Sequence, residues 1–158
     1  MTEPWRGVHV PADDGELLVL SGTQRRLKVT ARQTEGHLTA FVSAYPDRVP
    51  HPLHIHHDAI ESFFSIEGAA RFYVDGVVVD AEQGAFLSVP RGAVHGFVPT
   101  AAGTGALVMF TPAAMEGFWE EVERASSDGT LDEESLQTLS QRHHVELLGP
   151  LPEEMLGP

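Results

Sequence analysis

Between Glu16 and Phe110 the chain is divided into short runs rich in Val, Leu, Phe, Tyr and Thr, each ended by turn residues, and this pattern restricts it to an all-β fold. The Asp75-Gly76 pair lies between two such runs and predicts a two-residue hairpin, because a type I′ turn needs positive φ at both central positions. Many short strands at this spacing indicate a sandwich or a barrel. The expected strands cover residues 16–21, 24–30, 37–45, 62–66, 70–74, 76–79, 85–89 and 105–110.

The residues after 110 follow a helical pattern. Thr111-Pro112 predicts an N-cap followed by proline at the first helical position. Met115, Phe118, Trp119 and Val122 then form one apolar stripe, which we expect to pack on the barrel and which could close one of its mouths.

A second helix is expected from Thr130, where Thr130 and Glu133 fit a capping box, with Leu136 and Leu139 facing inward. The last sixteen residues, rich in proline and glycine, are expected to be irregular. We therefore expect a barrel over residues 1–110 and a helical extension over residues 111–158.

Charge and composition argue against several classes of partner, metal site and location. The 158 residues include 10 basic and 23 acidic side chains, so the net charge of −13 disfavours nucleic acid and anionic membranes. No cysteine is present, which rules out thiolate metal sites and cysteine nucleophiles. The N-terminus lacks the basic and apolar segments of a signal peptide, so we expect a cytoplasmic protein.

Four of the nine histidines crowd into residues 51–57. In a strand His54 and His56 point to the same side while Ile55 points away, and two imidazoles on one face suit a divalent metal. Glu61 and His95 complete a set of three histidines and one carboxylate. Such a set fits one ion of Fe, Mn, Co, Ni, Cu or Zn, with positions open for substrate, water or dioxygen. His57 is expected to point outward, and His51 is expected to be an ordinary loop histidine.

These residues resemble the two motifs of the cupin superfamily closely. The first motif is matched by His54-x-His56-x4-Glu61-x6-Gly68, and the second by Gly84-x5-Pro90-x-Gly92-x2-His95. Fifteen residues separate the motifs, as in compact single-domain members. Arg48 stands in place of the first glycine and Pro99 in place of the final asparagine, two positions that do not ligate metal.

The resemblance implies a cupin β-barrel, also called a jelly roll or double-stranded β-helix, with the metal inside one end and a homodimer as the common assembly. The wider layout resembles single-domain quercetin 2,3-dioxygenase-like cupins of bacterial secondary metabolism, a group that includes polyketide-cyclase-like members. Because cupins of this build include dioxygenases, cyclases, isomerases and binders, the fold does not decide the reaction.

Three functions remain open, all with a small-molecule partner. The favoured one is a quercetinase-like dioxygenase acting on an aromatic or polyketide-like substrate, in which Glu61 is both ligand and general base. The second is a non-redox cyclase or isomerase that uses the metal as a Lewis acid. The third is a metal-bound binding module without turnover. The predicted walls of the substrate pocket are Phe63 and Phe97, followed by Phe41, Tyr45, Met109 and Phe110.

Overall fold

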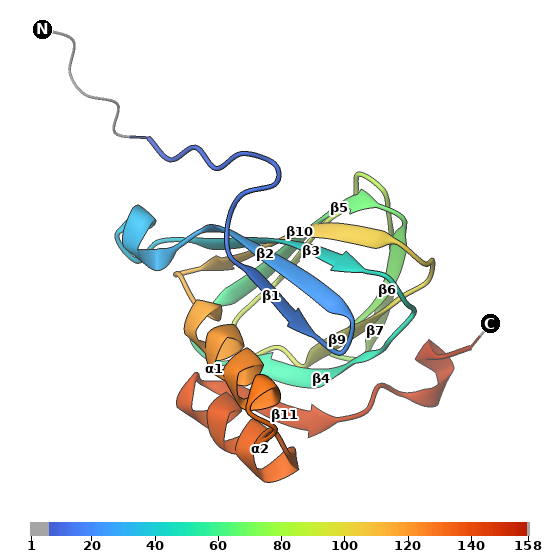
Figure 1. Cartoon of the computed structure of the whole chain (residues 1–158). Coiled ribbons are helices and arrows are strands. Elements are labelled where there is room, and N and C mark those ends of the chain that lie inside the picture. Colours follow the sequence, from blue (N-terminus) through green and yellow to red (C-terminus); the bar gives the residue numbers. More distant parts are fainter. Residues whose placement is uncertain (1–6, 158) are drawn as a thin grey trace, which may run out of the picture.

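Two antiparallel sheets face each other and enclose a barrel in the computed structural model, which describes residues 7–157 (Figure 1). The first sheet has the strand order β1-β2-β3-β10-β5-β8 and the second has the order β11-β4-β9-β6-β7. The expected cupin barrel with a short helical extension is confirmed. The strands are β1 (Leu17–Leu20), β2 (Thr23–Val29), β3 (Thr39–Tyr45), β4 (His51–His56), β5 (Ile60–Glu67), β6 (Ala69–Val74), β7 (Val77–Glu82), β8 (Phe86–Val89), β9 (His95–Pro99), β10 (Thr104–Thr111) and β11 (Val145–Gly149).

The predicted hairpin at Asp75-Gly76 joins β6 to β7. Asp75 has a φ of 45° and Gly76 a φ of 86°, as a type I′ turn requires, and Val74 pairs with Val77 across it. The turn fixes the register of the two strands, so Phe72 and Ala81 on their inner face join the core.

Aromatic side chains fill the barrel between the two sheets. Phe72 and Phe97 stack with their ring centroids 5.1 Å apart, and Phe63 lies within 5.5 Å of both. Each of these three rings is at most 5% exposed, so this end of the barrel is a packed core. Phe63 and Phe97 also border the cavity that remains open, whose other walls come mainly from β2, β3, β4, β10 and the two helices.

The first helix, α1 (Glu116–Ser127), begins later than predicted. Thr111 is not its N-cap, because β10 continues through Thr111, which pairs with Ile60 of β5. The helix starts only after the chain has left the sheet, with Met115 at the N-cap position. The predicted apolar stripe is nevertheless present, and Phe118 and Val122 are buried in the main core.

The second helix, α2 (Glu133–Arg142), is capped by Asp132 and not by Thr130. The Asp132 carboxylate accepts a hydrogen bond from the backbone N–H of Ser135, and the Ser135 hydroxyl accepts one from the N–H of Asp132. Thr130 instead donates its hydroxyl to the carbonyl of Ala125 at the end of α1. The capping box therefore exists two residues later than the sequence pattern suggested.

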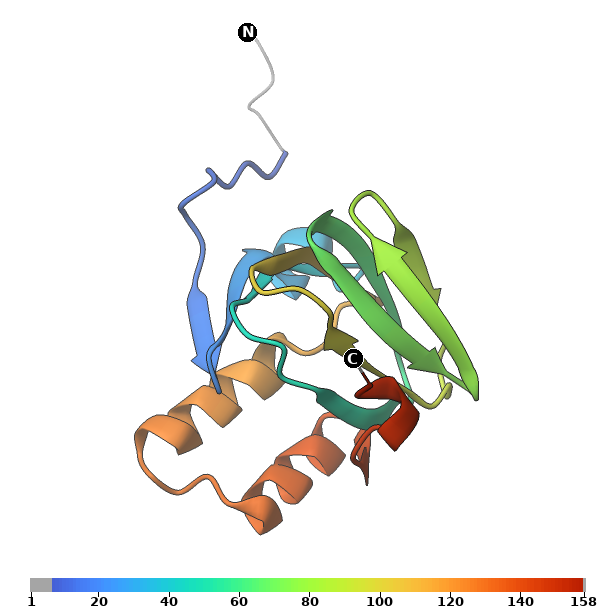
Figure 2. The same cartoon turned by 90° about the vertical axis from the view of Figure 1, so that its right-hand side faces the viewer.

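The C-terminal segment is not irregular, because β11 pairs with β4 in the second sheet. Val145 lies opposite His56 and Leu147 opposite His54, so this strand supports the segment that carries two predicted ligands. The division into residues 1–110 and 111–158 stays a prediction, but the extension contributes a strand to the barrel. Figure 2 shows α1 and α2 together at one side of the barrel, where they contact β1 and β11.

Two short 3-10 helices, η1 (Ala31–Thr34) and η2 (Glu153–Met155), complete the described elements. Within residues 7–157, neither α1 nor α2 has the length and apolar character needed to cross a membrane.

Candidate metal centre

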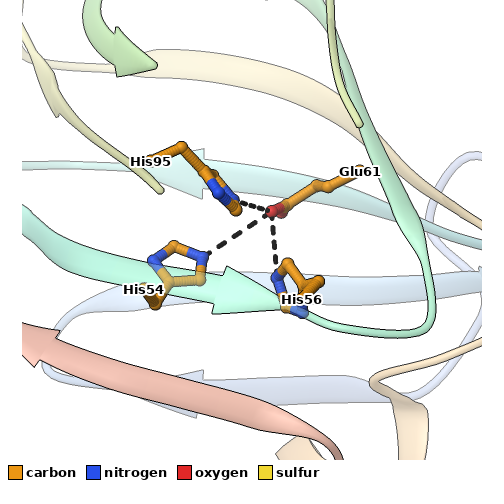
Figure 3. A group of neighbouring side chains, drawn as sticks. All are labelled: His54, His56, Glu61 and His95. Atoms are coloured by element: carbon orange, nitrogen blue, oxygen red, sulfur yellow. Dashed lines mark hydrogen bonds and ion pairs between the residues drawn. The ribbon is translucent and has the colours of Figure 1, made fainter. Parts of the chain in front are cut away.

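Four side chains from three strands converge inside the barrel (Figure 3). His54 and His56 come from β4, Glu61 from β5 and His95 from β9, and their donor atoms lie within 4.8 Å of one another. The Oε2 atom of Glu61 is 2.9 Å from His95 Nε2, 3.1 Å from His56 Nε2 and 3.7 Å from His54 Nε2. The structure thus brings together all four residues that the sequence predicts as ligands.

Backbone carbonyls hold two of the imidazoles by their other nitrogen. His54 Nδ1 donates to the carbonyl of Pro52 at 2.8 Å, and His95 Nδ1 donates to the carbonyl of Ala93 at 3.0 Å. Because a carbonyl only accepts, the proton of each neutral ring sits on Nδ1 and the lone pair of Nε2 faces the cluster. This is the arrangement found around metal-ligating histidines.

The cluster also fits a metal by its charge. Burial disfavours the ionised form of Glu61, but in the metal-free cluster the charge interaction with His56 and the hydrogen bonds that the three imidazoles donate outweigh burial and hold the pKa of the Glu61 carboxyl well below its usual range. The carboxylate is therefore charged and available as a ligand. Three imidazole nitrogens and one carboxylate oxygen at such distances could bind one divalent ion, and the donor types do not choose among the first-row metals.

A cavity of about 250 Å³ lies beside the cluster and is lined by three of its members, His54, His56 and Glu61. Five of the predicted pocket residues line it: Phe41, Tyr45, Phe63, Phe97 and Phe110. Phe118 and Trp119 of α1 and Leu136 of α2 also line it, so the two helices cover part of the cavity wall. Its lining is thus mainly aromatic and aliphatic, with polar groups at a few positions.

The prediction of Met109 as a pocket residue is wrong. Its neighbours on β10, Val108 and Phe110, both line the cavity, and successive side chains of a strand point to opposite faces. Met109 therefore faces away from the cavity. The alternation along β10 was available from the sequence and favours Val108 at this position.

His51 is a cavity residue that the sequence reading treated as an ordinary loop histidine. It is the first residue of β4, and its ring stacks on Phe97 with centroids 4.2 Å apart and planes 8° from parallel. Burial, with help from the charge of Arg25, lowers the pKa of His51 to about 3. The ring is therefore neutral, and its Nε2 atom is buried without a hydrogen-bond partner among the described residues.

Arg25 is the second residue that the sequence reading missed. It lies on the inner face of β2 with Thr23 and Leu27, is 7% exposed and lines the cavity. Its guanidinium carbon is 3.7 Å from the centroid of the Trp119 ring. Period-two alternation with Leu27 could have placed Arg25 inside, although an arginine in a core position is rare enough to be passed over.

His57 is exposed, as expected, with a side chain 49% accessible, and its Nε2 lies 3.0 Å from Glu146 Oε2. Neighbouring His56 is buried in the cluster. Because successive side chains of a strand point to opposite faces, His56 is a candidate ligand while His57 lies at the surface.

Comparison with known proteins shows which domain the cluster belongs to. Residues 41–111, which include all four converging side chains, match the model of the cupin domain. Quercetin 2,3-dioxygenase from Bacillus subtilis (strain 168) is 26% identical over 108 residues, which cover 67% of this chain and 32% of that protein. The chain therefore spans about a third of the length of this curated relative.

Solved structures show the same fold at low identity. KdgF from Halomonas sp. superposes with a TM-score of 0.61 at 18% identity, covering 67% of this chain and 94% of that one. Streptomyces PAC13 with uridine, described as a nucleoside dehydratase, has a TM-score of 0.59 at 10% identity and covers 92% of this chain and 93% of its own. Residues 41–111 therefore match a cupin domain, and the described chain has the fold of the solved cupin structures.

Proposed function

We propose that this chain is a metal-dependent cupin enzyme that oxidises a small aromatic or polyketide-like substrate with dioxygen. The observation that carries the proposal is the joint placement of the four-residue cluster and the aromatic cavity. His54, His56 and Glu61 of this cluster line a space of about 250 Å³ whose walls are mainly aromatic and aliphatic. The similarity to quercetin 2,3-dioxygenase supports this choice of reaction.

Different residues of the chain have different roles in the proposed reaction. A divalent ion, when bound, supplies a Lewis acid for an ionised substrate oxygen, and a redox-active ion also supplies the electron path that dioxygen chemistry needs. The three histidines and Glu61 would hold the ion, and the phenylalanines exclude bulk water from the substrate ring. Glu61 is the acceptor for the substrate's hydroxyl proton, because it is the acidic side chain among the residues that line the cavity.

Oxygen consumption tests the reaction. The protein as purified is mixed with quercetin, and separately with smaller aromatic enols, in an oxygen electrode with parallel product analysis. We expect about one dioxygen consumed per substrate converted, since a dioxygenase places both oxygen atoms in the product. Product without oxygen uptake would contradict the dioxygenase and favour a cyclase or isomerase. Saturable binding without any product would favour a binding module.

Replacing Glu61 tests its role as base. Glu61→Gln keeps the shape but cannot take a proton, so we expect turnover to fall by about 10²- to 10⁴-fold. Glu67→Gln, which removes an exposed carboxylate from the same strand, is the matched control and should retain wild-type turnover. Undiminished turnover in Glu61→Gln with bound metal would rule out proton transfer to Glu61.

A further inference from the structure

Arg25 carries a buried charge that makes no direct ion pair with a carboxylate among the described residues, although the charge of Glu61 acts on it at longer range. Its side chain is 7% exposed, and within residues 7–157 its guanidinium forms neither an ion pair nor a hydrogen bond. Its guanidinium carbon lies 3.7 Å from the centroid of the Trp119 ring. Contact with an aromatic face leaves all five N–H donors of the guanidinium without an acceptor.

A buried cation without an acceptor is costly, so its position needs an explanation. Glu61 is the one acidic side chain among the buried residues, and its carboxylate is already surrounded by three imidazoles. With a divalent ion held by that cluster, the positive charge around the cavity would exceed the single negative charge of Glu61. Glu61 alone would then have to balance both the ion and Arg25.

A second polar group in the same cavity also lacks a partner. His51 Nε2 is fully buried and without a hydrogen bond among the described residues, although the ring is held firmly between Phe97 and Tyr45. Arg25 enters from β2 and His51 from β4, and both line the cavity that opens onto the metal-binding cluster. His51 Nε2 has almost no accessible surface, whereas the Arg25 nitrogens are not among the enclosed atoms, so Arg25 is the polar side chain of the two that a ligand in the cavity can reach.

We propose that Arg25 is an anion subsite that binds a carboxylate of the substrate, so that the substrate is a small aromatic carboxylate held between Arg25 and the metal cluster. This rests on the proposed function for the reacting end of the substrate. The planar fork of an arginine matches a carboxylate in two parallel hydrogen bonds. A volume of about 250 Å³ restricts the ligand to a small molecule, and the aromatic walls suit a ring.

Trp119 offers a direct readout of binding because the Arg25 guanidinium lies against its ring. The sequence contains two tryptophans, so the substitution Trp5→Phe leaves Trp119 as the fluorophore. The probes are benzoate and benzamide, which have the same shape but differ in charge at neutral pH. We expect benzoate to bind about 10- to 100-fold more tightly than benzamide, as for a charge-assisted hydrogen-bonded pair. Equal affinities would overturn the proposal without recourse to any further variant.

Substitution of Arg25 tests whether this residue causes the preference for benzoate over benzamide. In the Trp5→Phe background, Arg25→Met keeps the length and removes the charge, and it should bind benzoate and benzamide with equal affinity. Arg32→Met, which removes an exposed arginine on η1, is the control and should keep the full preference. Arg25→Lys retains the charge and should keep part of the preference for benzoate. This variant still tests the subsite if Arg25→Met is unstable. A preference that survives in folded Arg25→Met would overturn the proposal.

Measuring the metal content distinguishes a failure of the Arg25 subsite from a failure of the proposed metal enzyme. Elemental analysis is made on every variant, and the titrations are repeated after chelation. A benzoate preference that disappears on chelation would place the carboxylate on the metal and overturn the Arg25 subsite, while leaving the metal enzyme intact. A preference that persists, in protein that never binds metal, would support the subsite and overturn the proposed enzyme.

Discussion

The histidines in this barrel differ in the role that they can take because their rings have different hydrogen-bond partners. His54 and His95 each donate Nδ1–H to a backbone carbonyl, which directs Nε2 toward Glu61. His51, only three residues before His54, has no such partner and stacks on Phe97 instead. The first two are therefore suited to ligate a metal, while His51 is a neutral group on the cavity wall.

The burial of His51 predicts a specific dependence of stability on pH. Its pKa in the folded protein is about 3, below the value of about 6.5 for an exposed histidine. Between these values the unfolded chain binds the proton more tightly, so His51 lowers the free energy of unfolding as the pH falls from 6.5 towards 3. Its contribution changes by up to about 1.4 kcal/mol per pH unit.

The substitution His51→Phe, which preserves the stacking but cannot be protonated, measures this contribution. Urea unfolding of the wild type and the variant is followed between pH 7 and pH 4. We expect the variant to lose less stability than the wild type as the pH falls. Parallel curves over this range would contradict the assignment of a buried neutral imidazole at this position.

The sequence was sufficient to predict the ligands but not the whole cavity wall. His54, His56, Glu61 and His95 could be predicted because an alternating strand and a familiar motif both point to them. Arg25 and His51 belong to no motif, and their place depends on which face of β2 and β4 turns inward. The volume left open between strands, which places them at a cavity, depends on packing that spacing alone does not determine.

At the scale of elements, the approach of β9 to β4 brings His95 beside His54. Gly96 makes this approach possible, because a Cβ built on it would lie 2.8 Å from the carbonyl oxygen of His51 and 2.9 Å from that of Pro52. These are backbone atoms that cannot move without shifting β4. The absence of a side chain at Gly96 therefore sets the separation of the two strands that carry the histidines.

Gly96→Ala should consequently destabilise the fold by about 1–3 kcal/mol, the usual cost of overpacking, and weaken metal binding. Gly105→Ala is the matched control, since its Cβ would meet only ordinary contacts at 3.7 Å or more and its φ is not in the left-handed region. Denaturant unfolding and metal titration check both effects. Equal behaviour of the two variants would contradict the role given to Gly96.

The element boundaries show where local patterns mislead. Thr111-Pro112 has the composition of a helix start, but pairing of Thr111 with Ile60 keeps it in β10. The segment containing β11 has glycine and proline at its end and looks irregular, yet Val145 and Leu147 pair with the ligand strand. In both cases a partner distant in sequence decides the conformation, which a short window of residues does not reveal.

At the scale of the whole molecule, the homodimer implied by the cupin resemblance stays a prediction. The strand β8 lies at the edge of the first sheet, and Phe64 and Phe86 form an exposed cross-strand pair on its outer face. Unpaired edges and exposed apolar side chains are features that a second copy can cover.

Sedimentation tests this assembly. We expect the wild type to sediment at twice the 17.2 kDa mass of one chain. Phe86→Lys places a charge on the outer face, where the side chain is 61% exposed, and should shift the protein to the monomer without loss of stability. A wild type that sediments at the mass of one chain would contradict the prediction.

The central claim, a divalent metal held by His54, His56, Glu61 and His95, is tested most directly by elemental analysis of the purified, untagged protein. The wild type is compared with His56→Ala, which removes a buried ligand, and with His57→Ala, which removes the exposed histidine beside it. We expect about one first-row transition metal ion per chain in the wild type and in His57→Ala, and almost none in His56→Ala, with all three folded. A wild type that remains free of metal after reconstitution, or a His56→Ala variant that keeps full occupancy, would contradict the account.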